Sequence, residues 1–460
     1  MKQEQILQKL YEKYIAPTCR ERRHLIGVEI ELPIVNLNRE AVDFNVVHAL
    51  TAAFCAEFGF EITGVDDEGH TNAAQNPENK DILSYDCSYN NLELSFGAEP
   101  DLNEIYRRFK LYYEYIQSFF APYNYTLTGM GVNPYRQYNR NVPIPNGRYR
   151  MLFHHLHSYD RYPGQLDFHP FPAYGTFASA SQVQLDVDFD RLPQTLNVMD
   201  RLEPLKALLF SNSVLPEYDP DLLCCRDMFW ENSTHGLNSR NVGMYDTEFQ
   251  TAEDVLDYIA GTSIYCVERG EKYINFPPIT ITDYLQKDAV EGEYFDGTGY
   301  QKITVHPEPE DIAYLRTFKF QDLTFRGTVE FRSACCQPIG EALTIVAFHL
   351  GLLRRLDALQ KLLEWDHAVY DKGYTPAELR KRFVRRTLPS FVDEDGVYAL
   401  LKSVVDLAKE GLLERGCGEE RFLAPLYERV RSRTNPALTM LTKLEAGTSM
   451  EDVIRQYAKL

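Results

Sequence analysis

Four segments of the chain alternate apolar and polar residues with the two-residue period of a β-strand. In each segment the apolar side chains share one face, and carboxylates, amides or arginines share the other. We therefore expect four strands of one antiparallel sheet that has an apolar face and a polar face. The four segments are residues 27–32, 91–96, 182–188 and 326–332.

The polar faces of these strands carry the oxygen ligands that hard cations such as Mg²⁺ prefer. Glu29 and Glu31 share a face roughly 6.6–7 Å apart, so each can hold a different cation of a cluster. Arg332 follows Glu330 by two residues, and its planar guanidinium suits a phosphate or a carboxylate. For any single strand, a solvent-exposed sheet face is the simpler explanation of the alternation. Four such strands together favour a ligand site.

Helical periodicity of three and four residues occupies much of the remaining chain. It predicts helices over residues 2–15, 47–58, 102–120 and 202–210, and then over 343–365, 376–386 and 396–414. Turn-rich residues at 66–81 and 129–175 predict long loops beside the sheet. We expect an α+β fold, with a catalytic domain at residues 1–338, helices behind its sheet, and a helical region at 339–460 packed against it.

The charge balance excludes several classes of partner. Among 460 residues, 48 Lys and Arg face 67 Asp and Glu, and the resulting net charge of −19 argues against nucleic-acid binding. No segment has the roughly 18 uninterrupted apolar residues of a membrane helix, and no export signal is visible. Nine cysteines without a Cys-x-x-Cys pair are typical of free thiols in a reducing compartment, so we expect a cytoplasmic protein.

Two further groups of residues invite a metal or redox interpretation. Cys224-Cys225 and Cys335-Cys336 are adjacent pairs, whose sulfurs point to opposite faces of a strand, so core packing is the better interpretation. His154, His155 and His157 cannot all share one face of either a helix or a strand. We expect these histidines to line or brace a substrate loop.

The usual nucleotide-binding sequences are missing from the chain. It has neither a Gly-x-x-x-x-Gly-Lys-Ser/Thr loop nor a Gly-x-Gly-x-x-Gly turn after a strand. A sheet face with several carboxylates can instead bind magnesium ions that clamp a triphosphate during phosphoryl transfer. Any ATP would therefore be held through metal ions and arginines.

The ordered set of polar strands resembles the glutamate-cysteine ligase family, whose members share a fold with glutamine synthetase. The matching segments lie between about residues 24 and 338, and Arg148-Tyr149-Arg150-Met151 also resembles a family segment. A looser match covers Phe229-Trp230 and Arg240-Asn241-Val242-Gly243. The stronger segments are Gly27-Val28-Glu29-Ile30-Glu31, Leu92-Glu93-Leu94-Ser95, Ser179-Ala180-Ser181-Gln182-Val183-Gln184 and Gly327-Thr328-Val329-Glu330-Phe331-Arg332 with Gln337-Pro338.

The resemblance implies two or three Mg²⁺ ions, with Mn²⁺ as an alternative, on the concave face of a curved antiparallel sheet. One ion would be held by Glu31, Asp86 and Glu93, and the second by Glu29, Gln184 and Glu330. Gln184 stands where a histidine is common in the family. Because its neutral amide oxygen is a weaker ligand, the second ion would bind less tightly or differ in identity.

The activity implied by the resemblance is ATP-dependent carboxylate–amine ligation. The side-chain carboxylate of glutamate would take the γ-phosphate of ATP, and the amine of cysteine would displace phosphate from the acyl phosphate. Arg332 would contact the phosphoryl group, and Arg148, Arg150 and Arg240 the substrate carboxylates. We expect specificity to lie in residues 129–175 and 224–245.

Two alternatives lie outside ligase chemistry. The first is a phosphotransferase, because guanidino kinases share a related fold. The second is a non-catalytic sensor of a nucleotide or amino acid. In each case the partners are small molecules, and exposed faces of the C-terminal helices leave room for a homodimer.

Overall fold

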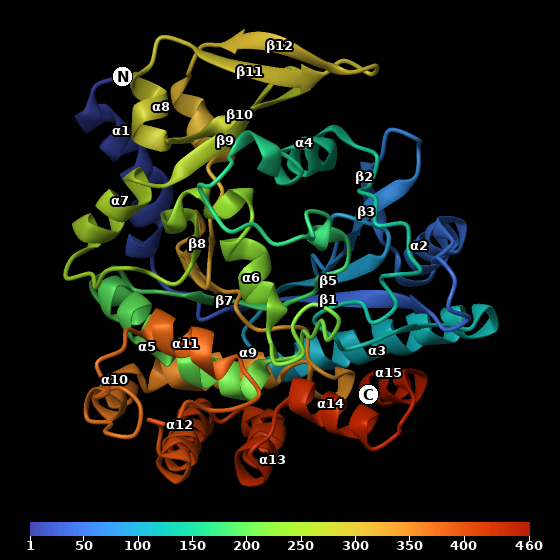
Figure 1. Cartoon of the computed structure of the whole chain (residues 1–460), viewed down its shortest axis with the longest axis vertical. Coiled ribbons are helices and arrows are strands. Elements are labelled where there is room, and N and C mark those ends of the chain that lie inside the picture. Colours follow the sequence, from blue (N-terminus) through green and yellow to red (C-terminus); the bar gives the residue numbers. More distant parts are fainter.

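The structure is a computed structural model that describes residues 1–460, and its centre is a nine-stranded sheet (Figure 1). The strand order is β14-β15-β7-β1-β5-β4-β3-β2, with β6 paired to the end of β1. The four predicted strands are therefore neighbours, as β15, β7, β1 and β5. The strands are β1 Ile26–Asn36, β2 Glu61–Val65, β3 Thr71–Gln75, β4 Ile82–Tyr85, β5 Asn91–Glu99, β6 Tyr125–Leu127, β7 Ser181–Asp186, β14 Gln321–Leu323 and β15 Thr328–Phe331.

All pairings within this sheet are antiparallel, which confirms the predicted sheet type. Its register brings the predicted polar residues together. Glu31 lies opposite Glu93 on β5, and Glu29 lies opposite Gln182 on β7. Gln184 lies opposite Glu330 on β15. Because alternate residues of a strand share a face, the polar residues of all four strands lie on one side of the sheet.

The apolar face of the sheet is buried under helices. Val28, Ile30 and Leu32 of β1 are almost completely inaccessible to solvent. Helix α3 (Leu102–Phe120) packs on β5 and helix α9 (Thr344–Arg354) packs on β7, with α5 (Leu192–Phe210) beside them (Figure 1). Buried apolar residues from Ile6 to Leu426 form one continuous core, so the regions before and after residue 338 share it.

The C-terminal region is helical, as predicted. The single helix expected at residues 343–365 is broken at Arg355 into two helices. In the helix at Pro376–Phe383, Arg380 donates hydrogen bonds to Glu203 on α5 and to Asp227. These buried contacts fix the helices to the sheet domain. The helices after α9 are α10 Leu356–Glu364, α11 Pro376–Phe383, α12 Glu394–Arg415, α13 Ala424–Ser432, α14 Pro436–Glu445 and α15 Met450–Tyr457.

A second sheet, which we did not predict, lies on the polar side of the first. Its order is β12-β11-β10-β9, and a short parallel pair of β8 and β13 lies between the two sheets (Figure 1). Its strands are β9 Ser263–Arg269, β10 Lys272–Thr280, β11 Val290–Phe295 and β12 Tyr300–Val305, and the short pair is β8 Val242–Gly243 with β13 Phe318–Lys319. The other helices are α1 Gln3–Leu10, α2 Phe44–Phe58, α4 Gly147–Leu156, α6 Cys225–Glu231, α7 Ala252–Ala260 and α8 Ile281–Gln286.

Two of the predicted loops contain regular structure. Residues 129–175 include helix α4, and residues 66–81 include strand β3, although the turns around Asp66 and Asn76 are present. The helix predicted at residues 2–15 is an α-helix that continues as a π-helical turn. No helix of the chain is both long enough and apolar enough to cross a lipid bilayer.

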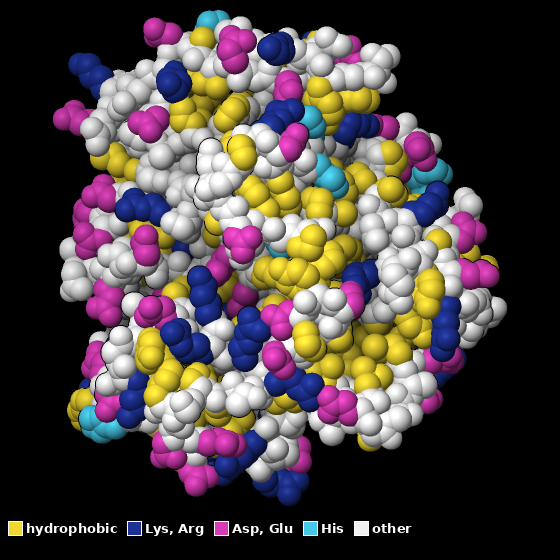
Figure 2. Space-filling model, viewed as in Figure 1, with side chains coloured by type: hydrophobic (Ala, Val, Ile, Leu, Met, Phe, Trp, Pro, Cys, Tyr) yellow, Lys and Arg dark blue, Asp and Glu magenta, His cyan; other side chains and the backbone are white.

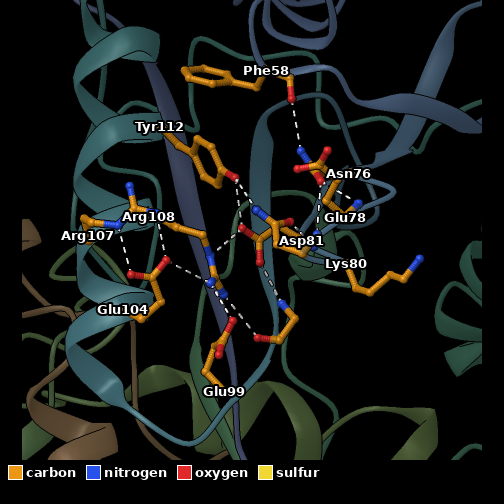
Figure 3. Close-up of polar contacts among 12 residues, drawn as sticks. Phe58, Asn76, Glu78, Lys80, Asp81, Glu99, Glu104, Arg107, Arg108 and Tyr112 are labelled. Carbon is orange, nitrogen blue, oxygen red and sulfur yellow. Dashed lines mark hydrogen bonds and ion pairs between the residues drawn. The ribbon is translucent and has the colours of Figure 1, made fainter.

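A buried ion pair anchors an irregularity of β5 (Figure 3). The register of β1 and β5 shifts between Ile26 and Val28, which places an extra residue in β5 near Gly97. Asp81 accepts a hydrogen bond from the Gly97 N–H at 2.8 Å, and Arg108 of α3 lies 2.8 Å from Asp81. A side chain at Gly97 would collide with the carbonyl oxygen of Asn79, so only glycine fits there.

Candidate active site

The largest cavity at the polar face has a volume of about 640 Å³ and lies between the two sheets. We call it the main cavity. Glu29 and Glu31 of β1, Glu93 of β5 and Glu330 of β15 reach it from three strands of the first sheet, with β7 between β15 and β1. Tyr265 and Tyr273 reach it from the second sheet, and α4 and α6 supply further walls. In the view of Figure 2, hydrophobic side chains gather across the middle of the molecule. The cavity thus has an acidic floor and a largely aromatic roof.

Three carboxylates form one acidic group on the floor: Glu31, Asp86 and Glu93. Glu31 is only 6% exposed and accepts hydrogen bonds from the backbone N–H of Ala180 at 2.6 Å and from Gln182 at 2.8 Å. Burial and then the neighbouring Asp86 raise the pKa of Glu31 well above its usual value. The same two causes raise the pKa of Glu93 to about 7. Such a group is stabilised by a cation.

The second predicted group, Glu29, Gln184 and Glu330, is held together by an amide. The Gln184 Nε2 donates to Glu29 at 3.0 Å and to Glu330 at 2.8 Å. Burial, followed by the charges of Glu93 and Glu330, raises the pKa of Glu29 to about 8. Arg332 donates to the other oxygen of Glu330 at 2.7 Å. The structure therefore brings together the trio that the resemblance assigned to a second ion, with the amide nitrogen, not the oxygen, facing both acids.

Four arginines line the main cavity: Arg148, Arg226, Arg316 and Arg332. Arg226, which the sequence did not indicate, lies in the first turn of helix α6 and is 6% exposed. Its guanidinium donates to the carbonyl oxygen of Ala334 at 3.0 Å, and no carboxylate lies within 4.0 Å of it. A buried guanidinium without an ion pair is costly, so this one is suited to receive an anionic ligand.

A second, basic cavity of about 570 Å³ continues along the same sheet face. It contains Gly27 of β1, Gln184 of β7 and Thr328 of β15. Gly27 and Thr328 each precede an acid of the main cavity, Glu29 and Glu330, by two residues on the same face of the strand. Glu29 lines both cavities, so the two lie end to end with this residue between them. The basic side chains of the second cavity are Arg20, Arg22, Arg23, Lys80 and Arg326.

A family model supplies the identification. The model of glutamate-cysteine ligase family 2 (GCS2) matches residues 25–459, which is nearly the whole chain. The chain belongs to this family. The match includes both sheets, the main cavity and the C-terminal helices, whereas Arg20, Arg22 and Arg23 of the basic cavity lie before it.

Plant members of the glutamate-cysteine ligase family are among the similar proteins. The chloroplastic glutamate–cysteine ligase of Arabidopsis thaliana is 25% identical over 347 residues, covering 71% of this chain and 60% of the plant protein. The enzyme of Solanum lycopersicum is 24% identical over 311 residues, covering 66% and 54%. The chain therefore spans about 60% of the length of the curated relatives it matches.

A solved structure shares the fold. The glutamate–cysteine ligase of Francisella tularensis, solved in complex with AMP, aligns with a TM-score of 0.51 at 11% sequence identity. The alignment covers 96% of this chain and 89% of the other chain. The α+β architecture expected for the family is thereby confirmed.

Two of the arginines assigned from the family resemblance lie outside the main cavity. Arg150 forms an ion pair with Asp67 at 2.5 Å and lies over the ring of Phe295. Arg240 lies 5.0 Å from the ring centre of Tyr258, in a separate small cavity. Neither residue lines the main cavity, and the assignment of both to substrate carboxylates stays a prediction.

The histidines of α4 do not converge. His154 contacts Glu293 on β11 at 2.6 Å, His155 stacks on Tyr265 at 3.9 Å, and His157 contacts the carbonyl oxygen of Phe153. No group of three acidic, histidine or cysteine side chains is already arranged around a single cation position. All nine cysteines are free.

The donor set of the acidic floor nevertheless fits divalent cations. Five buried or half-buried carboxylates and two amides can supply oxygen ligands, the class that Mg²⁺ and Mn²⁺ prefer. In the structure, Gln182 and Gln184 donate to the carboxylate oxygens that would coordinate an ion. A rotation of these amides is therefore sufficient to present oxygen atoms to a cation.

Proposed function

We infer that the protein catalyses ATP-dependent ligation of the glutamate side-chain carboxylate to the amine of cysteine. The observation that supports it most directly is the end-to-end arrangement of a basic cavity and an acidic cavity, joined at Glu29. A polyphosphate fits the first cavity and small amino acids fit the second. Their reacting groups would then meet above the floor near Glu29 and Glu330.

The basic cavity is assigned to the triphosphate of ATP. Its five basic side chains include Arg326, which also donates to the Gln184 side chain at 3.4 Å and so borders the acidic floor. Phosphates bind to guanidinium groups through charge-assisted, often bidentate hydrogen bonds. ATP lying along the strands would place its γ-phosphate at the Glu29 end of this cavity.

The acidic floor is assigned to divalent cations. Glu31, Asp86 and Glu93 would hold one ion, and Glu29, Glu330 and Gln184 a second. When bound, these ions neutralise the charge of the phosphates during phosphoryl transfer. Their number, two or three, and the choice between Mg²⁺ and Mn²⁺ can be measured by titrating the protein with Mn²⁺ and counting bound ions by electron paramagnetic resonance.

The arginines of the main cavity are assigned to the substrates. Arg332, fixed by Glu330, is positioned to contact the transferring phosphoryl group. Arg148 and Arg226 are available for glutamate carboxylates, because neither has a carboxylate within 4.0 Å. The chemistry then proceeds by positioning and charge stabilisation, and no nucleophilic side chain is required.

The experiment that tests this function measures ADP release with Mg-ATP and glutamate, with and without cysteine, together with mass detection of the dipeptide. Hydroxylamine is included as a small acceptor that traps an acyl phosphate as a hydroxamate. Cysteine-dependent ADP release and γ-glutamylcysteine, both lost in Glu29→Gln, are expected. Phosphorylated product without an amine would support the phosphotransferase instead, and ligand binding without turnover would support the sensor.

A further inference from the structure

The roof of the main cavity is more aromatic than glutamate and cysteine require. Six aromatic side chains line it, and they come from α4, α6, β9, β10, the turn before β13, and β13 itself. Five of them are only partly buried by the protein, and the sixth, Tyr265, is buried. We call this surface the aromatic wall. It consists of Tyr149, Trp230, Tyr265, Tyr273, Tyr314 and Phe318.

The aromatic wall begins beside the proposed reaction centre. Trp230 and Phe318 stack with their ring centres 4.6 Å apart at an angle of 15°. The guanidinium of Arg332 lies 5.6 Å from the ring centre of Phe318, and the same guanidinium donates to Glu330 on the acidic floor. The guanidinium of Arg332 therefore lies between a ring that packs on Phe318 and the site where the acyl phosphate would form.

A free guanidinium lies on the same segment of chain as Tyr314 and Phe318. Arg316, two residues before Phe318 and two after Tyr314, lines the main cavity and is exposed within it. It donates only to the carbonyl oxygens of Ala313 and Leu315, and no carboxylate lies within 4.0 Å. Guanidinium groups bind carboxylates in a planar, bidentate geometry. The wall and Arg316 together offer one surface for a ring and one for a carboxylate.

We propose that the acceptor subsite also takes aromatic α-amino acids, so that the protein forms γ-glutamyl dipeptides with an aromatic second residue. This inference rests on the proposed function. The ring of the acceptor would pack on Trp230 and Phe318, and its carboxylate would bind Arg316. Offset or edge-on contacts between rings are favourable beyond the area they bury.

The reaction balances with the components already named. The acceptor nitrogen attacks the carbonyl carbon of the glutamyl phosphate, the C–N bond forms, and the C–O bond to phosphate breaks. The ammonium group loses two protons, of which the departing phosphate takes one and the solvent the other. ADP, phosphate and the dipeptide are the products, and no oxidant or reductant is involved.

The experiment compares phenylalanine, cysteine, phenethylamine and hydroxylamine as acceptors, with Mg-ATP and glutamate and with mass detection of each product. We expect γ-glutamylphenylalanine, with kcat/KM for phenylalanine within tenfold of that for cysteine. Phenethylamine, which lacks the carboxylate, should be at least tenfold poorer than phenylalanine. In Arg316→Met this preference of phenylalanine over phenethylamine should fall at least fivefold.

The aromatic wall itself is tested by Trp230→Ala, with Tyr314→Ala as a second variant in case the first does not fold. Each should lower the ratio of kcat/KM for phenylalanine to that for cysteine at least tenfold. If hydroxamate forms with hydroxylamine but no γ-glutamylphenylalanine appears, the inference is wrong while the ligase function stands. If no acceptor supports ADP release, the ligase function itself has failed, and this inference with it.

Discussion

Glu31 and Glu93 lie directly opposite each other on β1 and β5, with no basic side chain bonded to either. Like charges opposite each other on neighbouring strands are destabilising, and burial adds to the cost. The two carboxylates therefore repel each other at the place where we assign a cation. This arrangement is typical of a site that is completed by its ligand.

The first prediction concerns this pair. In Glu93→Gln we expect a higher melting temperature than in the natural protein when divalent cations are removed, because the repulsion is relieved. Addition of Mg²⁺ should stabilise the natural protein more than the variant, which keeps only the second proposed ion site intact. Differential scanning calorimetry with and without chelator measures both effects, with the exposed Glu61→Gln as matched control. If Mg²⁺ raised the melting temperature of Glu93→Gln as much as that of Glu61→Gln, the assignment of a cation to Glu93 would be wrong.

The second prediction concerns Gln184. Gln184→Glu places a third carboxylate beside Glu29 and Glu330, so Mn²⁺ binding at this position should strengthen by about tenfold, or about 1.4 kcal/mol. Without metal the same variant should melt at a lower temperature, because three acids then share a buried position. Titration followed by electron paramagnetic resonance measures the affinity. Unchanged affinity would mean that residue 184 does not face a cation.

The third prediction separates the two cavities. Arg326→Met should raise KM for ATP by roughly tenfold, the loss of one charge-assisted hydrogen bond, with little change in KM for glutamate. Arg148→Met should have the opposite pattern, because Arg148 lines the main cavity only. Steady-state ADP release measures both constants. If both variants changed the same constant, the assignment of substrates to cavities would have to be abandoned.

The fourth prediction concerns the buried ion pair of Figure 3. Asp81 and Arg108 are 2% and 4% exposed, and Tyr112 also donates to Asp81 at 2.9 Å. Asp81→Asn leaves Arg108 with less compensation, so the free energy of unfolding should fall by about 3 kcal/mol. Arg107→Met removes an exposed pair with Glu104 and should cost at most about 1 kcal/mol. Urea denaturation of both variants makes the comparison.

The fifth prediction concerns pH. His169 accepts the Phe171 N–H at Nδ1 and contacts the Phe229 carbonyl oxygen through Nε2, so the ring is neutral. Burial lowers its pKa from 6.5 to about 4. Between these values the unfolded chain binds the extra proton, so stability is present above pH 6.5 and is lost as the pH falls toward 4.

In His169→Gln this contribution, on the order of 3 kcal/mol, disappears from the pH dependence. The difference in unfolding free energy between the natural protein and the variant should therefore shrink as the pH falls from 7 to 4. His367→Gln, at a side chain that is 85% exposed, is the matched control. A difference that stays constant over this range would contradict the prediction.

The alternation of apolar and polar residues allowed the first sheet to be predicted, because each of the four strands β1, β5, β7 and β15 has one apolar and one polar face. The second sheet escaped prediction for the opposite reason. Residues Ser263–Val267 of β9 are buried on both sides, so their sequence shows no period of two. A short buried run of this kind can equally belong to a helix.

The acidic residues of the site were predictable, whereas several arginines were not. The register of the sheet alone brings Glu29, Glu31, Glu93 and Glu330 together, and a strand pattern predicts that register. Arg226 and Arg316 reach the cavity from a helix and a turn whose position depends on packing between distant segments. Arg240 was assigned from the loosest part of the family resemblance, and its guanidinium lies elsewhere.

The irregularity at Gly97 decides which charges the nucleotide would meet. Glu93 and Ser95 point to the polar face, and unbroken alternation would send Glu99 to that face as well. The extra residue reverses the alternation, so Ala98 lines the basic cavity while Glu99 pairs with Arg108 on the helical side. With the same sequence and no such irregularity in the pairing, a carboxylate would stand beside the proposed triphosphate where the structure has a methyl group.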